Sequence, residues 1–405
     1  MNRSRNCLLS SVLVAGILAM ASGAALADAC TEAQPGALPA DAAELLGALP
    51  ADVQAGFEGY GSPVVASPFA DFKAPSEKPW TIGYNNSFSG NAWRAAALAE
   101  LEANVEKYKA LGLVDELIVT DSNGDTPTQI QQMRSLIQRG VDVIISIPGS
   151  PTAMNGVIDE AFEAGIPVIT LAAPVTTANA INVDTNGYLI GKTMALGLAQ
   201  LLEGKGNILT VEGIPGTSGS ALIQAGGAAV FENCPDIKIV NNLVGQWSES
   251  VAQTAVLQQL STNPTEIDGV WQQGSMFMGV IKAFEQAGRE TVPVTVGNPN
   301  QNSLAYWHDN APRGYKTVGS ANAPGAGMNL VFRTAMRVMM GQRLKVSNVV
   351  VRPPLITAAD LDKWWKPEFT VDSTGVGEPP AGTWMTDATL DGYFADPDGG
   401  IGWGV

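Results

Sequence analysis

The chain has 405 residues, 45% of them hydrophobic, and a formal net charge of −16 at pH 7. This length can bury a large core and predicts about two lobes. The acidic balance argues against nucleic acid and anionic membrane surfaces as partners, because both attract a basic patch.

The first 27 residues have the pattern of a secretory signal peptide. Arg3 and Arg5 precede an apolar stretch at 8–21, and Ala25-Leu26-Ala27 supplies the small residues that a signal peptidase requires. The alternative is a membrane anchor, but serines and a glycine interrupt the apolar stretch and no basic stop-transfer segment follows. We therefore expect an exported protein whose signal peptide (1–27) is cleaved near Ala27.

Residues 28–79 differ from the rest of the chain, since prolines follow one another too closely for long helices or strands. We expect an N-terminal extension that lies on the surface. From Trp80 onward, short β-rich strands alternate with amphipathic helices. Strands are expected at 81–84, 117–120, 141–147, 167–171, 207–211, 237–244, 269–272, 292–296, 318–320 and 346–351, and helices at 94–111, 129–139, around 157–162, and at 188–202, 221–231, 249–260, 276–287 and 326–340.

Strands of unbroken apolar residues, each followed by a helix, indicate parallel sheets that are covered on both faces. The pattern restarts after Val183, so the predicted fold class is α/β, with two doubly wound parallel-sheet lobes and a cleft between them. Ligands of such sheets bind beyond the carboxyl ends of the strands. After Pro353 the periodicity decays, and the Trp- and Gly-rich tail at 364–405 has no predicted structure.

Cysteine and histidine are scarce. Cys7 leaves with the signal peptide, so Cys30 and Cys234 remain. In an oxidising compartment these two can pair, or Cys234 can be a half-buried small apolar residue, and the sequence leaves both open. His308 is the single histidine, which removes the usual zinc arrangements.

Several segments partly match catalytic, cofactor or metal motifs. The segment Gly213-Ile-Pro-Gly-Thr-Ser-Gly219 follows a strand and opens a helix, as a dinucleotide fingerprint does, but no acidic residue ends the next strand at Val240-Asn-Asn242. The same segment misses the nucleophile elbow of hydrolases because Ser220 replaces the last glycine. The stretch Asp121-Ser-Asn-Gly-Asp125 lacks the acidic twelfth residue of a calcium loop and is better interpreted as a turn that caps the next helix. We expect no enzyme, no cofactor and no metal.

The loops after the strands share carboxamide and aromatic side chains. A carboxamide presents a donor and an acceptor in one plane, which matches two adjacent hydroxyls of a polyol, and Trp and Phe offer flat apolar faces to ring C–H groups. For Trp93 and Trp247, core packing is an equally good interpretation. The predicted ligand-binding residues are Phe88, Asn91, Trp93, Arg94, Trp247, Gln273, Asn298 and Asn322.

Residues 80–355 resemble the periplasmic sugar-binding proteins that feed ABC importers, of the ribose-binding, type I kind. The order of the motifs along the chain is more specific than any single motif. They are Asn86-Ser-Phe-Ser-Gly-Asn-Ala-Trp-Arg94, Gln138-Arg-Gly-Val-Asp-Val-Ile-Ile145, Ala164-Gly-Ile-Pro-Val-Ile-Thr170, Val183-Asp-Thr-Asn186, Glu212-Gly-Ile-Pro-Gly-Thr-Ser218 and Val296-Gly297.

The resemblance implies two lobes joined by three crossing strands, near Asn182, Ser320 and Val350, that close on the ligand by hinge bending. It implies a periplasmic monomer that delivers a small neutral sugar or polyol to an ABC permease in the inner membrane. The domain boundaries that follow are 80–182 with 323–345 for the N-terminal lobe, 183–322 with 346–363 for the C-terminal lobe, and 364–405 for the tail.

Two departures from the family pattern concern charged groups that usually form hydrogen bonds with sugar hydroxyls. An Asp-Arg pair of the family is replaced by Ala172-Ala173, and an Arg of the family falls near Ile223. A polyol, a modified sugar or a larger ligand therefore stays open. The alternative functions are a ligand-presenting receptor for chemotaxis or a sensor kinase and, with less support, a secreted enzyme; a sugar-responsive repressor is excluded by the leader and by the lack of a basic helix-turn-helix.

Overall fold

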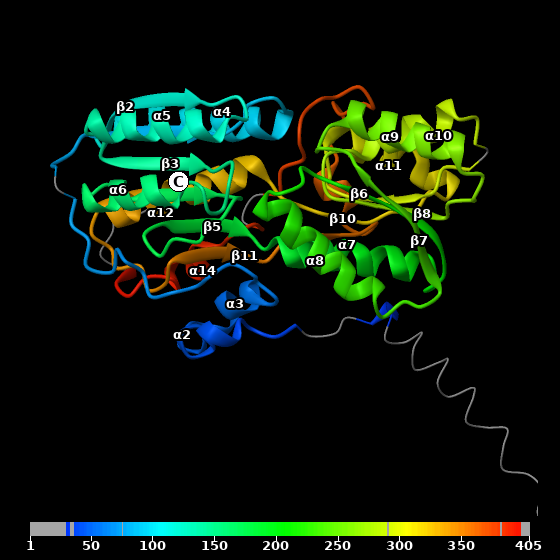
Figure 1. Ribbon diagram of the computed structural model, residues 1–405, viewed down its shortest axis with the longest axis horizontal. Helices are drawn as coiled ribbons and strands as arrows, with labels where there is room; N and C mark the ends of the chain where they lie inside the picture. The colour runs from blue at the N-terminus through cyan, green and yellow to red at the C-terminus, as the bar shows by residue number, and fades with distance from the viewer. Residues whose placement is uncertain (1–29, 33–35, 75, 290, 381–382, 398–405) are drawn as a thin grey trace, which may run out of the picture.

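The computed structural model describes residues 30–32, 36–74, 76–289, 291–380 and 383–397. The predicted signal peptide and its cleavage position lie outside the described residues. Two parallel sheets, each with helices on both faces, form two lobes that lie side by side (Figure 1). The predicted α/β class is confirmed.

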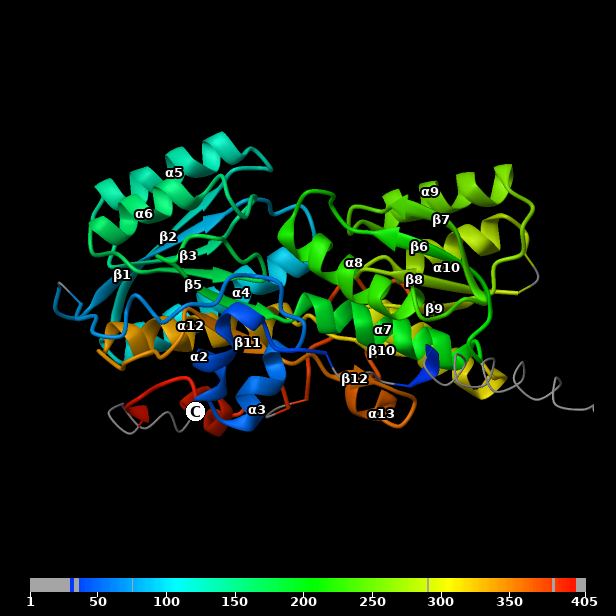
Figure 2. The same ribbon diagram turned by 60° about the horizontal axis from the view of Figure 1, so that its bottom comes forward.

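The first sheet has six parallel strands in the order β11-β5-β4-β3-β1-β2. They are β1 (Trp80–Asn86), β2 (Val114–Asp121), β3 (Val143–Ile147), β4 (Val168–Leu171), β5 (Ile181–Thr185) and β11 (Asn348–Val351). Helices α4 (Ala92–Ala110) and α12 (Pro324–Met339) cover one face, and α5 (Thr126–Gln138) and α6 (Asn155–Glu163) cover the other (Figure 2). Every residue of β3, β4, β5 and β11 is buried, as expected of strands with helices on both sides.

The second sheet repeats this plan with four parallel strands in the order β7-β6-β8-β9. The strands are β6 (Gly206–Glu212), β7 (Ile237–Val244), β8 (Gly269–Gln272) and β9 (Val294–Val296); α7 (Gly187–Leu201) and α8 (Ser218–Phe231) cover one face, and α9 (Glu249–Thr262) and α10 (Phe277–Gln286) the other. Helix α11 (Gln301–Asn310) follows β9. A short antiparallel pair, β10 (Gly319–Ser320) and β12 (Leu355–Ile356), extends the lobe beside β9.

The chain crosses between the lobes later than the predicted boundaries. β5 runs to Thr185 and β11 to Val351, and the two pair in parallel register from Asn182 with Asn348 to Thr185 with Val351. Residues 183–185 and 348–351 therefore belong to the first sheet, whereas the sequence placed them in the C-terminal lobe. Local periodicity predicts a strand at 346–351, close to β11, but none at β5, which only the family resemblance indicated as a crossing near Asn182. Periodicity also does not say which sheet a strand joins.

Most of the N-terminal extension is exposed or half-buried, but several of its apolar side chains enter the core, which the sequence did not predict. Its short helices α2 (Ala43–Gly47) and α3 (Ala51–Gln54) contribute Leu46 and Val53 to the core of the first lobe, and the Phe57 side chain is 0% exposed. Cys30 and Cys234 form a disulfide with their Cα atoms 4.8 Å apart, which fixes the start of the extension to the second lobe. The extension thus contacts both lobes.

The C-terminal tail also contacts both lobes. The helix α13 (Leu361–Trp364) leads into it, and α14 (Asp387–Asp391) lies within it. Gly377 N donates to the Pro299 carbonyl in the second lobe (2.8 Å), while the Glu378 carboxylate accepts hydrogen bonds from Gly325 N (2.8 Å) and Ala326 N (3.1 Å) at the start of α12 in the first lobe. A carboxylate at this position complements the positive end of the helix dipole. The tail is a further link between the lobes beside the three crossings.

The loop 121–125 is the helix-capping turn that the sequence predicts. Asp125 Oδ2 accepts a hydrogen bond from Thr128 N (2.8 Å) at the start of α5. Hydrogen bonds from the Thr128 side chain and from this backbone N–H hold the pKa of the Asp125 carboxyl below its usual value. No helix of the described residues combines the length and the apolar character that a membrane span needs.

Candidate functional site

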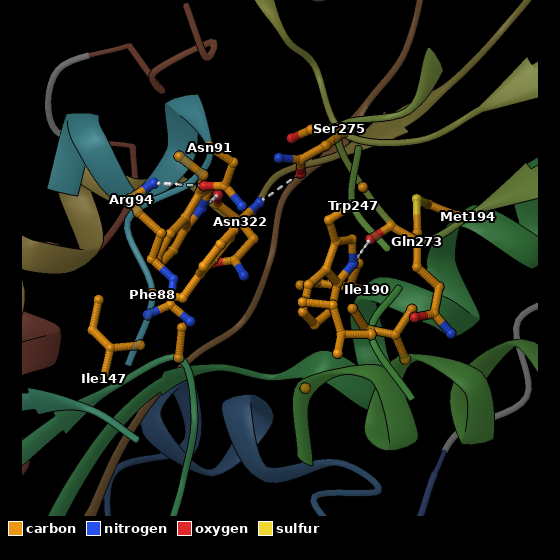
Figure 3. Close-up of a pocket in the computed structure, with 17 residues that line it drawn as sticks. Phe88, Asn91, Arg94, Ile147, Ile190, Met194, Trp247, Gln273, Ser275 and Asn322 are labelled. Atoms are coloured by element: carbon orange, nitrogen blue, oxygen red, sulfur yellow. Dashed lines mark hydrogen bonds between the residues drawn. The ribbon is translucent and has the colours of Figure 1, made fainter. Parts of the chain in front are cut away.

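One pocket lies beyond the carboxyl ends of the strands, between the two lobes (Figure 3). All eight predicted ligand-binding residues line it, although they come from loops and helix starts that are far apart in sequence. The 17 lining residues are Phe88, Asn91, Trp93, Arg94, Ile147, Ala172, Ile190, Met194, Ile214, Gly219, Ile223, Trp247, Gln273, Gly274, Ser275, Asn298 and Asn322. None of them is Asp or Glu, and Arg94 carries the one charge.

Asn91 caps the N-terminus of α4 and so sets the position of Trp93 and Arg94, which follow it in the chain. Its backbone is extended, and its Oδ1 accepts a hydrogen bond from Arg94 N at 2.9 Å, which is a standard N-cap. Trp93 and Arg94 therefore fall in the first helical turn, at the pocket. The Nδ2 group of Asn91 makes no hydrogen bond to another described residue.

The charged guanidinium of Arg94 donates its hydrogen bonds to neutral side chains. It donates to Asn86 Oδ1 (2.7 Å) and to Ser87 Oγ (3.1 Å), and Asn86 in turn donates to the Asp121 carboxylate (2.7 Å). Burial lowers the pKa of Arg94 to about 10, so the side chain remains charged at neutral pH. It keeps further N–H donors that can serve a ligand.

Trp93, Asn322 and Asn298 form a chain of contacts across the cleft. The Trp93 indole donates to the Asn322 carbonyl oxygen (2.7 Å), and Asn322 N donates to Asn298 Oδ1 (2.9 Å). Asn322 lies on the crossing between β10 and α12, and Asn298 follows β9. The indole N–H is thus satisfied within the protein, and the ring face remains for apolar contact.

Trp247 follows β7 and lies in a slot made by glycines. A Cβ atom at Gly213 would lie 2.1 Å from the Trp247 ring, and one at Gly274 would lie 3.1 Å from it. Gly213 therefore makes room for an indole, which explains this glycine without a dinucleotide, and Gly216 has a left-handed backbone (φ 84°) that favours glycine. Gln246 and Trp247 both have left-handed backbones (φ 53° and 52°), which cost free energy in residues with a Cβ and concentrate at functional sites.

Gln273 lies in the pocket wall, but its carboxamide is already engaged. Its Oε1 accepts from Gly213 N (2.9 Å) and Ser220 Oγ (2.8 Å), and its Nε2 donates to the Ser220 carbonyl (3.2 Å) and to Gln224 Oε1 (3.1 Å). All four hydrogen-bonding positions of the amide are occupied, and the residue is 2% exposed. Its part in the site is to hold the β6–α8 loop against β8.

The sequence did not single out the remaining lining residues as contacts. They are Ile147, Ala172, Ile190, Met194, Ile214, Gly219, Ile223, Gly274 and Ser275. Most are apolar, and an isoleucine on an amphipathic helix has the same pattern whether it faces a core or a cavity. The one available signal was the loss of charge at Ala172 and near Ile223. No group of three or more His, Cys, Asp or Glu side chains able to hold a metal ion occurs in the part of the chain that the structure describes.

Residues 82–342 match the family model described as periplasmic binding protein domain. The chain is a periplasmic binding protein. Among its relatives, it is 29% identical over 243 residues to the xylitol-binding protein of Mycolicibacterium smegmatis, covering 59% of this chain and 68% of that one. It is 28% identical over 255 residues to the galactofuranose-binding protein of Escherichia coli, covering 60% and 76%.

A solved ABC transporter solute-binding protein from Thermobispora bispora has the same fold as this periplasmic binding protein, with a TM-score of 0.66 and 27% identity. The match covers 72% of this chain and 90% of that one. The resemblance to type I sugar-binding proteins is thereby confirmed. The N-terminal extension and the tail lie outside the matched family domain.

Proposed function

We propose that this periplasmic binding protein captures a small neutral sugar or polyol in the pocket between its lobes and delivers it unaltered to an ABC permease in the inner membrane. The proposal includes a monomer, export to the periplasm and cleavage of the signal peptide near Ala27. The named relatives are binding proteins, and two of them are named for a polyol and a sugar.

One observation carries this proposal. Uncommitted amide and guanidinium groups lie beside aromatic faces in a single pocket. The Asn322 carboxamide, the Nδ2 groups of Asn91 and Asn298, and the outer N–H groups of Arg94 make no hydrogen bonds to other described residues beyond those given above. Each can pair with a ligand hydroxyl, while Phe88 and Trp93 supply flat surfaces.

A pocket of this kind suffices for a transport receptor. Micromolar affinity corresponds to about −8 kcal/mol. Each hydrogen bond to an uncharged partner contributes roughly 0.5–1.5 kcal/mol, and burial of a sugar face on an aromatic ring adds an apolar term. A few such contacts in a closed cleft reach that affinity without any catalytic group.

A thermal-shift screen over sugars, alditols and cyclitols tests the binding step. A ligand at a hundred times its dissociation constant adds about 2.7 kcal/mol to the free energy of unfolding, which raises the melting temperature measurably. The Asn322→Leu variant is the matched control, because it keeps side-chain size and loses the free carboxamide. No response to any compound, or an equal response in the variant, contradicts the proposal.

Uptake of the radiolabelled hit by cells with and without the gene tests the delivery step. We expect uptake at low external concentration to depend on the gene. Unchanged uptake in its absence would separate a binding role from a transport role.

A further inference from the structure

The two walls of the pocket differ in chemistry. Besides the polar residues Gln273, Ser275 and Asn298, the second lobe contributes Ile190 and Met194 from α7, Ile214 from the β6–α8 loop, Ile223 from α8, and Trp247. The Ser275 hydroxyl donates to Asn300 Oδ1 at 3.3 Å. Figure 3 shows Ile190, Met194 and Trp247 together on the side of the pocket opposite Asn91, Arg94 and Phe88. The group of Ile190, Met194, Ile214, Ile223 and Trp247 is called the apolar wall below.

The polar atoms beside the apolar wall are already paired within the second lobe. The Trp247 indole N–H donates to the Gln273 carbonyl oxygen at 2.8 Å. All four positions of the Gln273 carboxamide are occupied by Gly213, Ser220 and Gln224. The wall therefore offers ring and aliphatic surface to a ligand and no unpaired side-chain donor or acceptor.

The side-chain groups that have no hydrogen-bond partner among the described residues lie on the side of the pocket opposite the apolar wall, and where that side meets the second lobe. Arg94 and Asn91 come from the start of α4, Asn322 from the β10–α12 crossing, and Asn298 from the loop after β9. A ligand hydroxyl against the apolar wall would lose its water partners and gain none, whereas a hydrocarbon group there would gain burial. A ligand with hydroxyls on every side does not match this pocket.

We infer that the ligand is a sugar or polyol that carries an alkyl or aryl substituent. Its hydroxylated side is held by Asn91, Arg94 and Asn322, and its hydrocarbon substituent packs against the apolar wall. The inference rests on the proposed function and deepens it, since it names the class of sugar derivative that the pocket selects.

Calorimetric titration with matched series tests this inference. Each series contains one free sugar, its methyl glycoside and its phenyl glycoside in both anomers, for glucose, galactose, xylose and ribose. We expect a substituted member to bind about tenfold more tightly than the free sugar in at least one series, as hydrophobic-pocket contacts commonly provide. If the free sugar binds as tightly or more tightly in every series that binds, the inference is wrong and the proposed function stands. If no member of any series binds, the inference is wrong, while the proposed function stands or falls on the separate screen of sugars, alditols and cyclitols.

A pair of variants tests whether the tighter binding of the substituted glycoside comes from the apolar wall. Ile214 is half-buried in a loop, so Ile214→Asn is expected to fold; Ile239→Asn, at a 48% exposed position on β7, is the matched control. We expect Ile214→Asn to weaken binding of the substituted glycoside by about tenfold and to change binding of the free sugar by less than about twofold. Ile239→Asn should change neither. Equal losses for both ligands in Ile214→Asn, with unchanged circular dichroism, overturn the inference.

Discussion

The indole Nε1 of Trp93 lies 2.7 Å from the backbone carbonyl oxygen of Asn322 and donates a hydrogen bond to it. This bond joins the first turn of α4 to the crossing that enters α12, and both ends line the pocket. Trp93 therefore has two separable parts, a ring face for the ligand and an N–H group that fixes the crossing.

Trp93→Phe separates these two parts, because phenylalanine keeps an aromatic face and loses the donor. We expect ligand affinity to fall roughly fivefold, which corresponds to about 1 kcal/mol for one net hydrogen bond. Calorimetry with the screened ligand measures it. Trp365→Phe is the control, since the buried Trp365 indole nitrogen has no hydrogen-bond partner among the described residues and Trp365 lies outside the pocket lining. Unchanged affinity in Trp93→Phe would remove this bond from the site.

A substitution at Gln246 tests whether the left-handed backbone next to Trp247 is strained. The residue is exposed and has φ 53°, a conformation that glycine adopts without steric cost. We expect Gln246→Gly to raise the free energy of unfolding by about 0.5–1 kcal/mol in urea denaturation. The matched substitution Gln258→Gly, at an exposed position inside α9, should lower it by about 1 kcal/mol. Destabilisation by both would show that position 246 is not strained.

Asp184 makes stability depend on pH. It lies on β5 between β4 and β11, and burial raises its pKa to about 7, although hydrogen bonds from Thr185 N and Tyr60 act in the opposite direction. The folded state then binds the proton more tightly than the unfolded chain does. This contribution to stability is therefore fully present below about pH 4 and is lost as the pH rises toward 7, at up to about 1.4 kcal/mol per pH unit.

Asp184→Asn should remove this loss, so the variant gains stability relative to the wild type as the pH rises from 4 to 7. Chemical denaturation at several pH values gives the difference between the two proteins. Asp115→Asn, at an exposed position on β2, is the control for a general change in charge. A difference between wild type and Asp184→Asn that stays constant over this pH range would contradict the assignment.

The disulfide between Cys30 and Cys234 closes a loop with a sequence separation of 204. Replacing both cysteines by serine should lower the free energy of unfolding by roughly 2–4 kcal/mol in non-reducing buffer, mainly because the unfolded chain becomes less constrained. Wild-type protein in reducing buffer should show a similar loss. Equal stability of oxidised wild type and the double variant would show that the bond does not form in solution.

Much of the fold could be predicted because its signals are local. The run at Val143–Ile147 is β-branched and continuous, and it is a fully buried strand. The rule that ligands bind beyond the carboxyl ends of parallel strands predicted eight residues of loops and helix starts that line one pocket, since strand ends in one sheet share an edge. Their role as ligand contacts stays a prediction.

The parts of the fold and the site that could not be predicted depend on contacts between segments that are distant in the sequence. Nothing near Phe57 indicates that it packs with Tyr393, and nothing near Val350 indicates that its backbone N–H and carbonyl both bond to the Tyr393 hydroxyl. The sequence shows that the loop after β8 carries the amide of Gln273, but not which groups bind it. Only the assembled fold shows that Gly213 and Ser220 occupy that amide.

Calorimetric titration of the screened ligand into wild type, Asn322→Leu and Trp247→Ala tests most directly whether ligand is held between the lobes. The two substitutions alter opposite walls of one pocket. We predict one ligand per chain in the wild type and a loss of at least about tenfold in affinity in each variant, with both variants folded. Wild-type affinity in both variants would contradict the account.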